Sequence, residues 1–427
     1  GPSDLGAGDD PVVLAAAINT LTIVDVETVT GGSTNDTIVV GAQATGIVVD
    51  LGAGRDRLVL GDFTNTVTVS GIETVTGGAD DDTVAFATGS TGTVVTLGDG
   101  GDTLVLGDAG TTVTVSDAET ITGGTGDDTV TLATAPSGLA IDLGGGADTL
   151  VLGDFVNTVT VSDVESVLGG TNDDVVALDG TITGASIDLG SGDDSLTLAS
   201  GGATVTIVDA ETITGGAGDD TVVLAASADG LTIDLGSGDN TLVFGDFVNT
   251  LTVAGLSTIT GGTTDDTVTL STAVTAGLVD LGTGNDTLTL ADHVNTLTVA
   301  NVETLSGGAS ADIVTLSPQA TGITVDLHAG ADSLTLADQA NTLTISGVET
   351  VTGGSDIDRI TLTGGTTGST VDLGIGADAV VLGAAVNTVT LSNVETITGG
   401  ASADRVTLAT AYETGTIDLG GGSDALT

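Results

Sequence analysis

The sequence contains no cysteine, tryptophan or methionine, and it has only four prolines. Without cysteine the chain has neither disulfides nor thiolate metal sites, so in an oxidising compartment it would need some other cross-link. One tyrosine and five phenylalanines in 427 residues mean that any core is thin and lined by aliphatic side chains. The basic residues are four arginines, against 59 aspartates and glutamates, which gives a formal net charge of −55. This charge repels nucleic acid and attracts metal cations or basic surfaces.

Long hydrophobic runs are also missing. The apolar stretch 12–18 falls far short of the roughly 18 residues of a membrane helix, so we expect no membrane insertion. At the N-terminus, Gly1-Pro2-Ser3 precedes the first in-phase residue and resembles a remnant of tag cleavage. We expect residues 4–427 to form one continuous repeat solenoid that is a segment of a longer protein.

What the sequence does contain is a strict repeat. Its hydrophobic fraction of 40% is too high for a disordered acidic chain, and its 68 glycines lack the period of collagen. Eight of the nine glutamates are spaced by 46 residues, with one double step in which Ser257 takes the missing place. These glutamates are Glu27, Glu73, Glu119, Glu165, Glu211, Glu303, Glu349 and Glu395. The chain therefore consists of about nine repeats of 46 residues.

Each repeat carries two turns rich in glycine and aspartate. One turn reads GGxxxD, as in 123–128, and its last aspartate is present in all nine copies. The other reads DLGxGxD, as in 188–194, and it ends in aspartate in nine of ten copies, with Asn240 as the exception. Measured between their final aspartates, successive turns are separated alternately by a shorter and a longer segment, of about 20 and about 26 residues.

Between the turns, apolar residues alternate with threonine and other residues, which predicts strands with one buried face. Segments of about 20 or about 26 residues cannot bury such a face alone, but stacking them at about 4.8 Å per layer gives a continuous core. The sequence therefore predicts an all-β, right-handed parallel β-solenoid whose 46-residue repeat forms two coils, of about 20 and about 26 residues. We expect strands at 128–132 and 139–143 in the shorter coil, and a third strand at 165–168 in the longer one. The expected inward-facing residues include Leu58, Leu60, Val67, Val69, Val84, Ile141 and Leu143.

Stacked turns create an electrostatic problem. Two carboxylates about 5 Å apart repel each other by roughly 3 kcal/mol at an effective dielectric constant of 20, and a column of about nineteen turns would sum this repulsion. Four arginines cannot neutralise such a column, whereas calcium binds six to eight oxygens and fits glycine-rich turns better than magnesium does. The stacked carboxylates that such a cation would separate are the final aspartates of the turns, which are Asp10, Asp36, Asp56, Asp82, Asp102, Asp128, Asp148, Asp174, Asp194, Asp220, Asp266, Asp286, Asp312, Asp332, Asp358, Asp378, Asp404 and Asp424.

These turns resemble the RTX family, the calcium-binding repeats of bacterial secreted proteins, whose nonapeptide is GGxGxDxUx with U a large apolar residue. Residues 215–223 and 123–131 match this nonapeptide throughout. The DLGxGxD turns match it from the second position, as in 51–58, where Leu51 stands in place of the first glycine. The resemblance covers essentially the whole chain.

The resemblance implies a parallel β-roll in which calcium lies between stacked turns, bound by the matching aspartates and by glycine carbonyls. It also implies type I secretion and folding on meeting external calcium. Family repeats follow one another directly, whereas here the turns are separated by the two longer segments described above, so we expect a calcium row along one edge only. Turns that depart from the motif are expected to bind weakly or not at all, and they contain Thr34, Asp80, Asn172, Thr264, Ser310, Asp356 and Ser402, or Thr96, Asn240 and His328.

Other regular features suggest further roles. A Thr-x-Thr pair follows the corner in all nine repeats, as at Thr158 and Thr160, and it could present a hydroxyl ladder to ice or to a polysaccharide. The asparagine before this pair, such as Asn157, is expected either to form a stacked amide ladder or to cap the corner, and the periodic glutamates are expected to face solvent. Neither His293 nor His328 belongs to a catalytic constellation, so we expect no enzyme activity.

The function expected from the sequence is therefore structural. We predict a calcium-dependent extracellular rod, part of a surface layer, a matrix filament or an adhesin stalk of a bacterium. Its partners would be calcium ions, with self-association or other surface proteins and polysaccharide as further candidates. The alternatives are an ice- or polysaccharide-binding solenoid and an RTX secretion and folding module of a larger secreted enzyme.

Overall fold

The computed structural model describes residues 3–6, 8–412 and 414–427. The regular secondary structure of these residues consists of β-strands alone. Of the expected remnant Gly1-Pro2-Ser3, Gly1 and Pro2 lie outside the described residues, and Ser3 pairs with Ile23. The chain divides into two compact units, Gly1–Gly216 and Ala217–Thr427, which we describe one at a time. Among the described residues, no helix is long and apolar enough to span a membrane.

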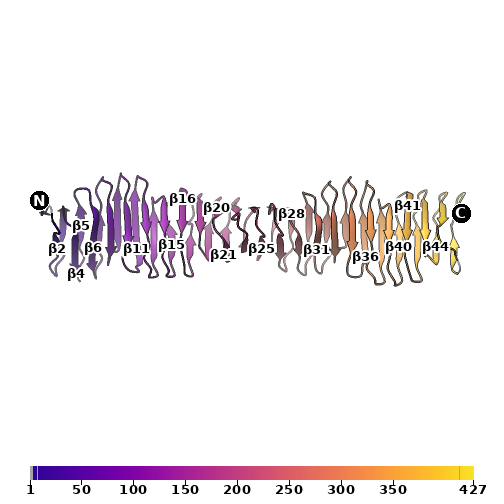
Figure 1. The fold of residues 1–427 in the computed structure, drawn as a ribbon, viewed down its shortest axis with the longest axis horizontal. Helices are drawn as coiled ribbons and strands as arrows, with labels where there is room; N and C mark the ends of the chain where they lie inside the picture. Colours follow the sequence, from indigo (N-terminus) through magenta and orange to yellow (C-terminus); the bar gives the residue numbers. More distant parts are fainter. Residues whose placement is uncertain (1–2, 7, 413) are drawn as a thin grey trace. The chain divides into compact units, whose positions relative to one another are not determined.

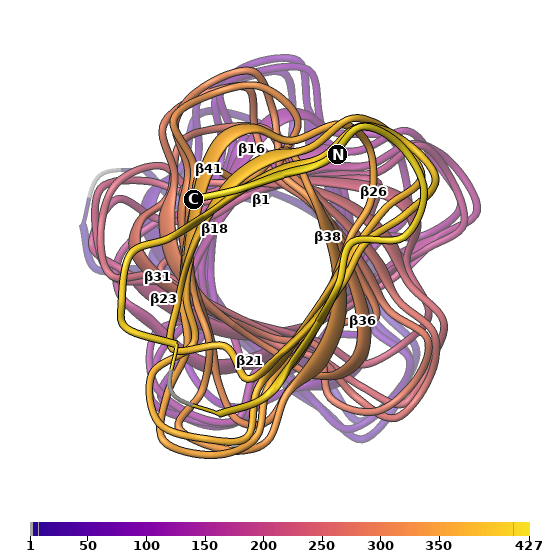
Figure 2. The same cartoon turned by 90° about the vertical axis from the view of Figure 1, so that its right-hand side faces the viewer.

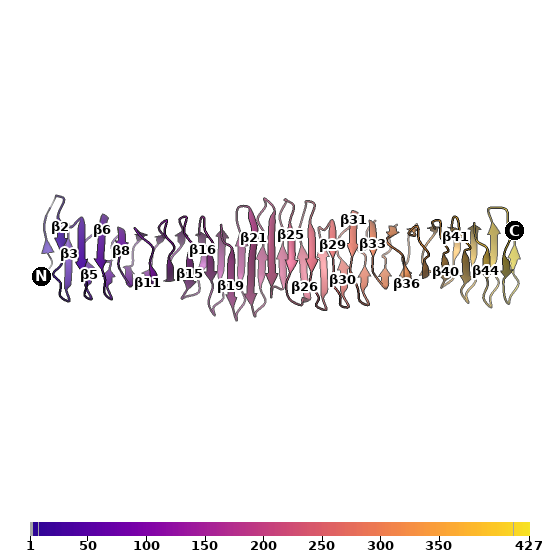
Figure 3. The same ribbon diagram turned by 90° about the horizontal axis from the view of Figure 1, so that it is seen from below.

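Within each unit, every strand pairs in parallel with the strand two places further along the chain. Odd-numbered strands therefore form one sheet and even-numbered strands a second sheet, which we call the odd sheet and the even sheet. Figures 1 and 3 show the strands of successive coils side by side within each unit, and Figure 2 shows the connecting loops at the outside of the coils. Each unit is thus an all-β parallel β-solenoid, which confirms the predicted fold class.

The first unit holds the first twenty-four strands. Its odd sheet contains β1 (Ser3–Asp4), β3 (Thr20–Val24), β5 (Thr37–Val40), β7 (Arg57–Val59), β9 (Thr74–Gly78), β11 (Thr91–Gly98), β13 (Thr112–Ser116), β15 (Thr129–Leu132), β17 (Thr149–Val151), β19 (Ser166–Gly170), β21 (Ile182–Gly190) and β23 (Ala203–Val208). Its even sheet contains β2 (Pro11–Val13), β4 (Thr28–Gly32), β6 (Thr45–Gly52), β8 (Thr66–Ser70), β10 (Thr83–Phe86), β12 (Thr103–Val105), β14 (Thr120–Thr122), β16 (Ser137–Asp142), β18 (Thr158–Ser162), β20 (Val175–Leu178), β22 (Ser195–Thr197) and β24 (Thr212–Thr214).

The second unit continues the same alternation. Its odd sheet contains β25 (Thr221–Leu224), β27 (Thr241–Phe244), β29 (Thr258–Thr260), β31 (Thr275–Asp280), β33 (Thr296–Ala300), β35 (Ile313–Leu316), β37 (Ser333–Thr335), β39 (Thr350–Thr352), β41 (Thr367–Asp372), β43 (Thr388–Ser392), β45 (Arg405–Leu408) and β47 (Ala425–Leu426). Its even sheet contains β26 (Asp229–Asp234), β28 (Thr250–Ala254), β30 (Thr267–Leu270), β32 (Thr287–Thr289), β34 (Thr304–Ser306), β36 (Thr321–Asp326), β38 (Thr342–Ser346), β40 (Arg359–Leu362), β42 (Ala379–Leu382), β44 (Thr396–Thr398) and β46 (Thr416–Asp418).

The core lies between the two sheets of each unit. Aliphatic residues alternate with threonine along the strands, so one face of each strand is buried and the other faces solvent, as in the burial pattern of β8. All seven residues predicted to face inward are at most 2% exposed, which confirms the predicted strand phase. Because these side chains are aliphatic, the two sheets can pack closely without large aromatic rings.

The predicted coil lengths are wrong. β10 begins at Thr83 and β15 at Thr129, so one 46-residue repeat contains five strands and hence two and a half coils. Thr129 pairs with Thr149, and Thr149 pairs with Ser166. Hydrogen bonds between neighbouring coils accordingly span about one coil of chain, for example 17, 20 and 21 residues. The longer segment between turns, which the sequence suggested was one coil, contains three strands and forms one and a half coils.

An additional corner in each repeat explains this difference. Six non-glycine residues at this corner have positive φ, namely Asp25, Asp117, Asp163, Asp209, Asn301 and Asn393, and Gly71, Gly255 and Gly347 take the same place in the other repeats. Aspartate, asparagine and glycine tolerate the left-handed conformation better than other residues do. The chain therefore turns between β18 and β19, for example, without needing a glycine-rich motif.

An odd number of strands per repeat also places equivalent residues on alternate sheets. Asp128 precedes β15 in the odd sheet, whereas Asp174 precedes β20 in the even sheet. The strands of the two sheets begin at opposite edges of a coil, so the candidate turns occupy both edges in alternation. The prediction that they form a row along a single edge is wrong.

Candidate functional site

Most of the predicted ligand aspartates are buried at the corners. Sixteen of the eighteen are at most 1% exposed, while Asp10 and Asp424 are partly buried. Each lies at the end of a glycine-rich turn, immediately before a strand. Several of the turn glycines are needed at these corners: Gly52 has a φ of +84°, and a Cβ there would lie 2.3 Å from the carbonyl oxygen of Gly32.

The structure arranges these aspartates in polar ladders of four residues in successive coils. In the ladder that contains Asp82, the backbone N–H and the side-chain amide of Asn65 both donate to Asp82 Oδ1, at 3.0 and 2.9 Å. The N–H of Asp82 donates to Asp102 Oδ1 at 2.7 Å, and the N–H of Asp102 donates to Glu119 Oε2 at 2.8 Å. Each carboxylate thus accepts a hydrogen bond from the backbone of the preceding coil. We call the two aspartates of a ladder the first and the second aspartate.

The same ladder recurs through both units. Complete ladders are Asn19, Asp36, Asp56 and Glu73; Asn65, Asp82, Asp102 and Glu119; Thr111, Asp128, Asp148 and Glu165; Asn157, Asp174, Asp194 and Glu211; Asn249, Asp266, Asp286 and Glu303; Asn295, Asp312, Asp332 and Glu349; and Asn341, Asp358, Asp378 and Glu395. Shorter ladders are Asp10 and Glu27; Asp220 and Asn240; and Asn387, Asp404 and Asp424. No column of about nineteen aspartates exists among the described residues of either unit, because each run of carboxylates ends at its glutamate.

The sequence predicts roles for the glutamate and the asparagine that do not include the hydrogen bonds of the ladder. The periodic glutamates were expected to be solvated charge, yet seven of them accept a hydrogen bond within a complete ladder, such as Glu73 from the N–H of Asp56 at 2.6 Å. The asparagines do cap the corners, since Asn295 Nδ2 donates to the carbonyl oxygens of Ala291 and His293 at 3.0 and 2.7 Å. They form no amide ladder, because neighbouring repeats place them on alternate sheets. The spacing of 17 residues between asparagine and first aspartate would have revealed the ladder only with the register known.

The first and second aspartates differ in their environment. Burial raises the pKa of Asp82, and the side-chain amide and N–H of Asn65 oppose that shift by donating to its carboxylate. Asp102 has no such amide, and burial together with the nearby charges of Asp82 and Glu119 raises its pKa to about 6 against a single N–H donor from Asp82. The same causes raise the pKa of Asp148, Asp194, Asp286, Asp332 and Asp378 to about 6.

The second aspartates also have a buried oxygen without a donor. Among the described residues, the Oδ2 atoms of Asp56, Asp102, Asp148, Asp194, Asp286, Asp332 and Asp378 are buried and have no hydrogen-bond partner. The same holds for the Oδ2 atoms of five first aspartates, Asp36, Asp128, Asp174, Asp266 and Asp312. A buried oxygen of this kind is costly unless it receives a proton or faces a cation. A proton, a cation or a water molecule is therefore needed to satisfy each of these oxygens.

Asn240 shows what surrounds that oxygen. It replaces the second aspartate in its repeat, and its Oδ1 accepts the N–H of Asp220 at 2.8 Å, as the aspartates do in the other ladders. Its Nδ2 donates to the carbonyl oxygens of Gly255 and Leu235, at 2.7 and 3.3 Å. In the repeat of Asp286 the equivalent residues, 46 positions further on, are Leu281 and Asn301. By this equivalence we expect the Oδ2 of a second aspartate to face main-chain carbonyl oxygens.

The donor chemistry of these corners suits a hard cation. Carboxylate and carbonyl oxygens are the ligands that calcium prefers. Among the described residues, no three or more side chains of histidine, cysteine, aspartate and glutamate converge on one point. Among these residues a calcium ion at a corner would therefore have at most two side-chain carboxylates as ligands, and its remaining ligands would be main-chain carbonyls or water.

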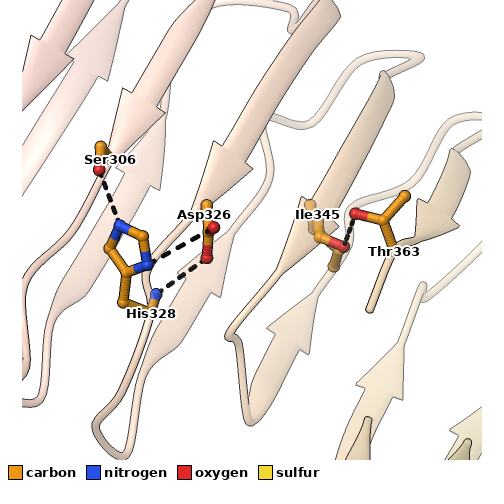
Figure 4. A network of polar contacts seen from close by, with 5 residues as sticks. All are labelled: Ser306, Asp326, His328, Ile345 and Thr363. Carbon is orange, nitrogen blue, oxygen red and sulfur yellow. Dashed lines mark hydrogen bonds and ion pairs between the residues drawn. The ribbon is translucent and has the colours of Figure 1, made fainter. Parts of the chain in front are cut away.

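Protein cations do not supply the missing charge. Within the part of the chain that the structure describes, the ion pair found is between His328 Nδ1 and Asp326 Oδ2, at 3.5 Å, and no arginine pairs with a ladder carboxylate. Figure 4 shows that His328 Nε2 also lies 3.0 Å from Ser306 Oγ, while Thr363 Oγ1 donates separately to the carbonyl oxygen of Ile345. His328 takes the left-handed place of a turn glycine with a φ of 63° and is half exposed, so it lies outside the ladders.

Comparisons with known proteins add little to this description. No protein-family model and no curated protein matches the chain. Among solved structures, the chain resembles the X-ray crystal structure of a hyperactive, Ca2+-dependent, β-helical antifreeze protein from an Antarctic bacterium, with 16% sequence identity over 79% of this chain and 81% of that one. The TM-score of 0.15 is too low to support an argument about function. The RTX resemblance of the turns thus stays a prediction.

Proposed function

We propose that this chain is a calcium-dependent structural solenoid of the bacterial cell surface or extracellular matrix. The observation that carries the proposal is the buried Oδ2 atom of the second aspartates, which has no donor in seven ladders. A calcium ion in the corner would satisfy this oxygen and the neighbouring carbonyls together. The second aspartates would be the principal ligands, and the other predicted aspartates would hold the corner through the ladder.

Binding energy in such sites becomes folding energy. An ion that binds the folded chain alone stabilises it by its binding free energy, and many weak sites act together. Calcium at the millimolar concentrations outside cells saturates sites of modest affinity. A cysteine-free chain with a net charge of −55 would in this way gain cross-links only after export. The RTX-like turns support type I secretion, and the unbroken repeats support a role in a surface layer, matrix filament or adhesin stalk.

Circular dichroism during a calcium titration tests this proposal. The full chain, freed of metal at neutral pH, is expected to have a weaker β-sheet signal and a lower melting temperature, and to gain in both as calcium is added. Magnesium is expected to act poorly, because it demands strict octahedral geometry and retains its waters. Identical spectra and melting curves with and without calcium would contradict the proposal.

A second candidate function is binding to ice, and the even sheet of the second unit favours it. Seven exposed or half-exposed threonines there are in register in successive strands: Thr250, Thr267, Thr287, Thr304, Thr324, Thr344 and Thr361. Beside them, Thr252, Thr269, Thr289 and Ser306 form a second rank, so four strands present an uncharged array of hydroxyl and methyl groups. Rungs spaced by about 4.8 Å form a regular lattice that ordered water can match. The absence of aromatic rings from both ranks favours ice over a polysaccharide.

Thermal hysteresis of the folded chain tests this second candidate. Thr287→Tyr interrupts the first rank and is expected to abolish hysteresis, whereas Thr258→Tyr on the odd sheet, next to Leu278, is the matched control and is expected to preserve it. Absence of hysteresis in the parent chain, or equal hysteresis in both variants, would contradict ice binding.

A further inference from the structure

One repeat of the second unit departs from the ladder at two positions. Asn240 takes the place of the second aspartate and Ser257 takes the place of the glutamate, so this repeat has one ladder carboxylate, Asp220, where complete ladders have three. The backbone is unchanged, because the N–H groups of Ser257 and Thr258 both donate to the carbonyl oxygen of Asn240 at 3.0 Å. This ladder therefore has fewer charged side chains than the complete ladders, but the repeat keeps the backbone hydrogen bonds of its coil.

The side chain of Asn240 satisfies its corner completely. It is fully buried, and both ends of its amide have partners: Oδ1 accepts from Asp220, and Nδ2 donates to Gly255 and Leu235. Asp286, one repeat later, accepts the N–H of Asp266 through Oδ1 at 2.7 Å, but its buried Oδ2 has no partner. The amide N–H groups of Asn240 thus satisfy the main-chain carbonyl oxygens of their corner, as a bound cation would do at Asp286.

We infer that the corner at Asn240 binds no cation and is closed by the amide instead, so that this repeat of the second unit stays folded when calcium is removed. The expected number of calcium ions per chain rests on the proposed calcium function. Closure of the corner by the amide rests on the hydrogen bonds of Asn240 alone. The sixth turn of the DLGxGxD series is thereby closed without calcium, among turns whose closure depends on calcium.

Reciprocal substitutions in the full chain test the inference. Asn240→Asp restores the carboxylate and is expected to raise the number of calcium ions bound per chain by one, measured by equilibrium dialysis with metal analysis. Asp286→Asn is expected to lower that number by one. Asn285→Asp is the matched control, because it adds the same charge at an exposed turn position and is expected to leave the number unchanged.

Melting of the metal-free proteins at neutral pH gives a second readout. Asp286→Asn is expected to melt above the parent chain, because the new amide donates to the corner carbonyls, and Asn240→Asp is expected to melt below it. Calcium should return Asn240→Asp to the parent's melting temperature. Unchanged calcium binding and unchanged metal-free melting in Asn240→Asp would overturn the inference.

The two readouts separate this inference from the proposed function. If no protein binds calcium but the metal-free melting temperatures shift in opposite directions as expected, the proposed function fails and amide closure at Asn240 is supported. If the parent chain and Asp286→Asn bind calcium as expected while Asn240→Asp gains none, the proposed function stands and the inference fails.

Discussion

At the scale of single residues, the ladders combine buried carboxylates with too few donors. The first aspartate of a ladder receives a backbone N–H and, in most repeats, an asparagine amide, whereas the second receives an N–H alone. This difference explains why burial raises the pKa of Asp332 to about 6. The asparagine is therefore a structural residue. In most ladders both aspartates have a buried Oδ2 atom without a partner, and the second aspartate has the fewer donors to its carboxylate.

Removing a ladder asparagine should destabilise the fold. Asn295→Ala loses the bonds from Nδ2 to Ala291, His293 and Asp312, and leaves Asp312 with fewer donors. We expect a loss of about 1–3 kcal/mol in unfolding free energy, measured by chemical denaturation in calcium. Asn285→Ala, at an exposed turn position, is the control and should be close to neutral. Equal stability of the two variants would show that the amide contributes nothing.

The pH dependence of the metal-free chain should be opposite to that of most proteins. Burial raises the pKa of Asp102, Asp148, Asp194, Asp286, Asp332 and Asp378 from 3.8 to about 6, so the folded state binds protons more tightly than the unfolded state. The stabilisation by these protons is complete below the unfolded pKa and is lost as the pH rises through the folded pKa.

Thermal melts of the metal-free chain check this. We expect a higher melting temperature at pH 5 than at pH 7.5, in concentrated sodium chloride to screen the general repulsion between surface carboxylates. A melting temperature that rises between these two pH values would contradict the assignment of the second aspartates as buried acids without donors.

At the scale of strands and corners, each repeat depends on a corner that the glycine-rich motifs do not mark. Gly255 occupies this corner with a φ of 66°, and Asn301 occupies it one repeat later with a φ of 52°. The corner therefore accepts residues that tolerate the left-handed conformation and excludes β-branched residues.

Substitution of Gly255 tests this. Gly255→Asn should cost less than Gly255→Val, because asparagine holds the equivalent corner at residue 301. It should still cost some stability, since a Cβ at Gly255 would lie 2.4 Å from the carbonyl oxygen of Gly236 and the backbone must shift. Gly255→Val should cost roughly 1–3 kcal/mol in unfolding free energy, since a β-branched residue is strained at positive φ. Chemical denaturation in calcium provides the measurement. Similar losses in both variants would indicate that glycine itself is required.

The same corner explains what the sequence could and could not predict. Alternation of aliphatic residues and threonine correctly predicted the buried face, for instance at Leu58 and Val84, because that signal is local. The coil length depended on whether the residues around Asp163 turn the chain, and a single aspartate in a Ser-Asp-Val sequence has no strong local signature. With the coil length wrong, the pairing of the aspartates with asparagine and glutamate, 17 residues away, could not be found.

At the scale of the whole molecule, the repeat is the unit that carries both packing and charge. Hydrogen bonds between coils span about one coil of chain, for example 17, 20 and 21 residues, so removing one complete repeat should restore equivalent contacts at the junction. Deleting residues 287–332 joins Asp286 to Ser333, which is equivalent to Thr287. We expect this variant to keep its β-sheet spectrum and cooperative melting in calcium.

Deletion of half a repeat, residues 287–309, joins Asp286 to Ser310 and interrupts the ladder that ends at Glu303. This variant should melt at a lower temperature than the complete-repeat deletion, as followed by circular dichroism. If the half-repeat deletion is the more stable of the two, the two-and-a-half-coil repeat is not the packing unit.

The most direct test of the account is a crystal structure of the chain grown with calcium at neutral pH, with anomalous scattering to locate the ions. The account predicts a calcium ion bound to Oδ2 of second aspartates such as Asp286 and Asp332, together with corner carbonyls, and none at Asn240. Second aspartates with no ion beside their Oδ2 atoms in the presence of calcium, with a protonated carboxyl that donates to a carbonyl oxygen or with a water molecule in the corner instead, would contradict it.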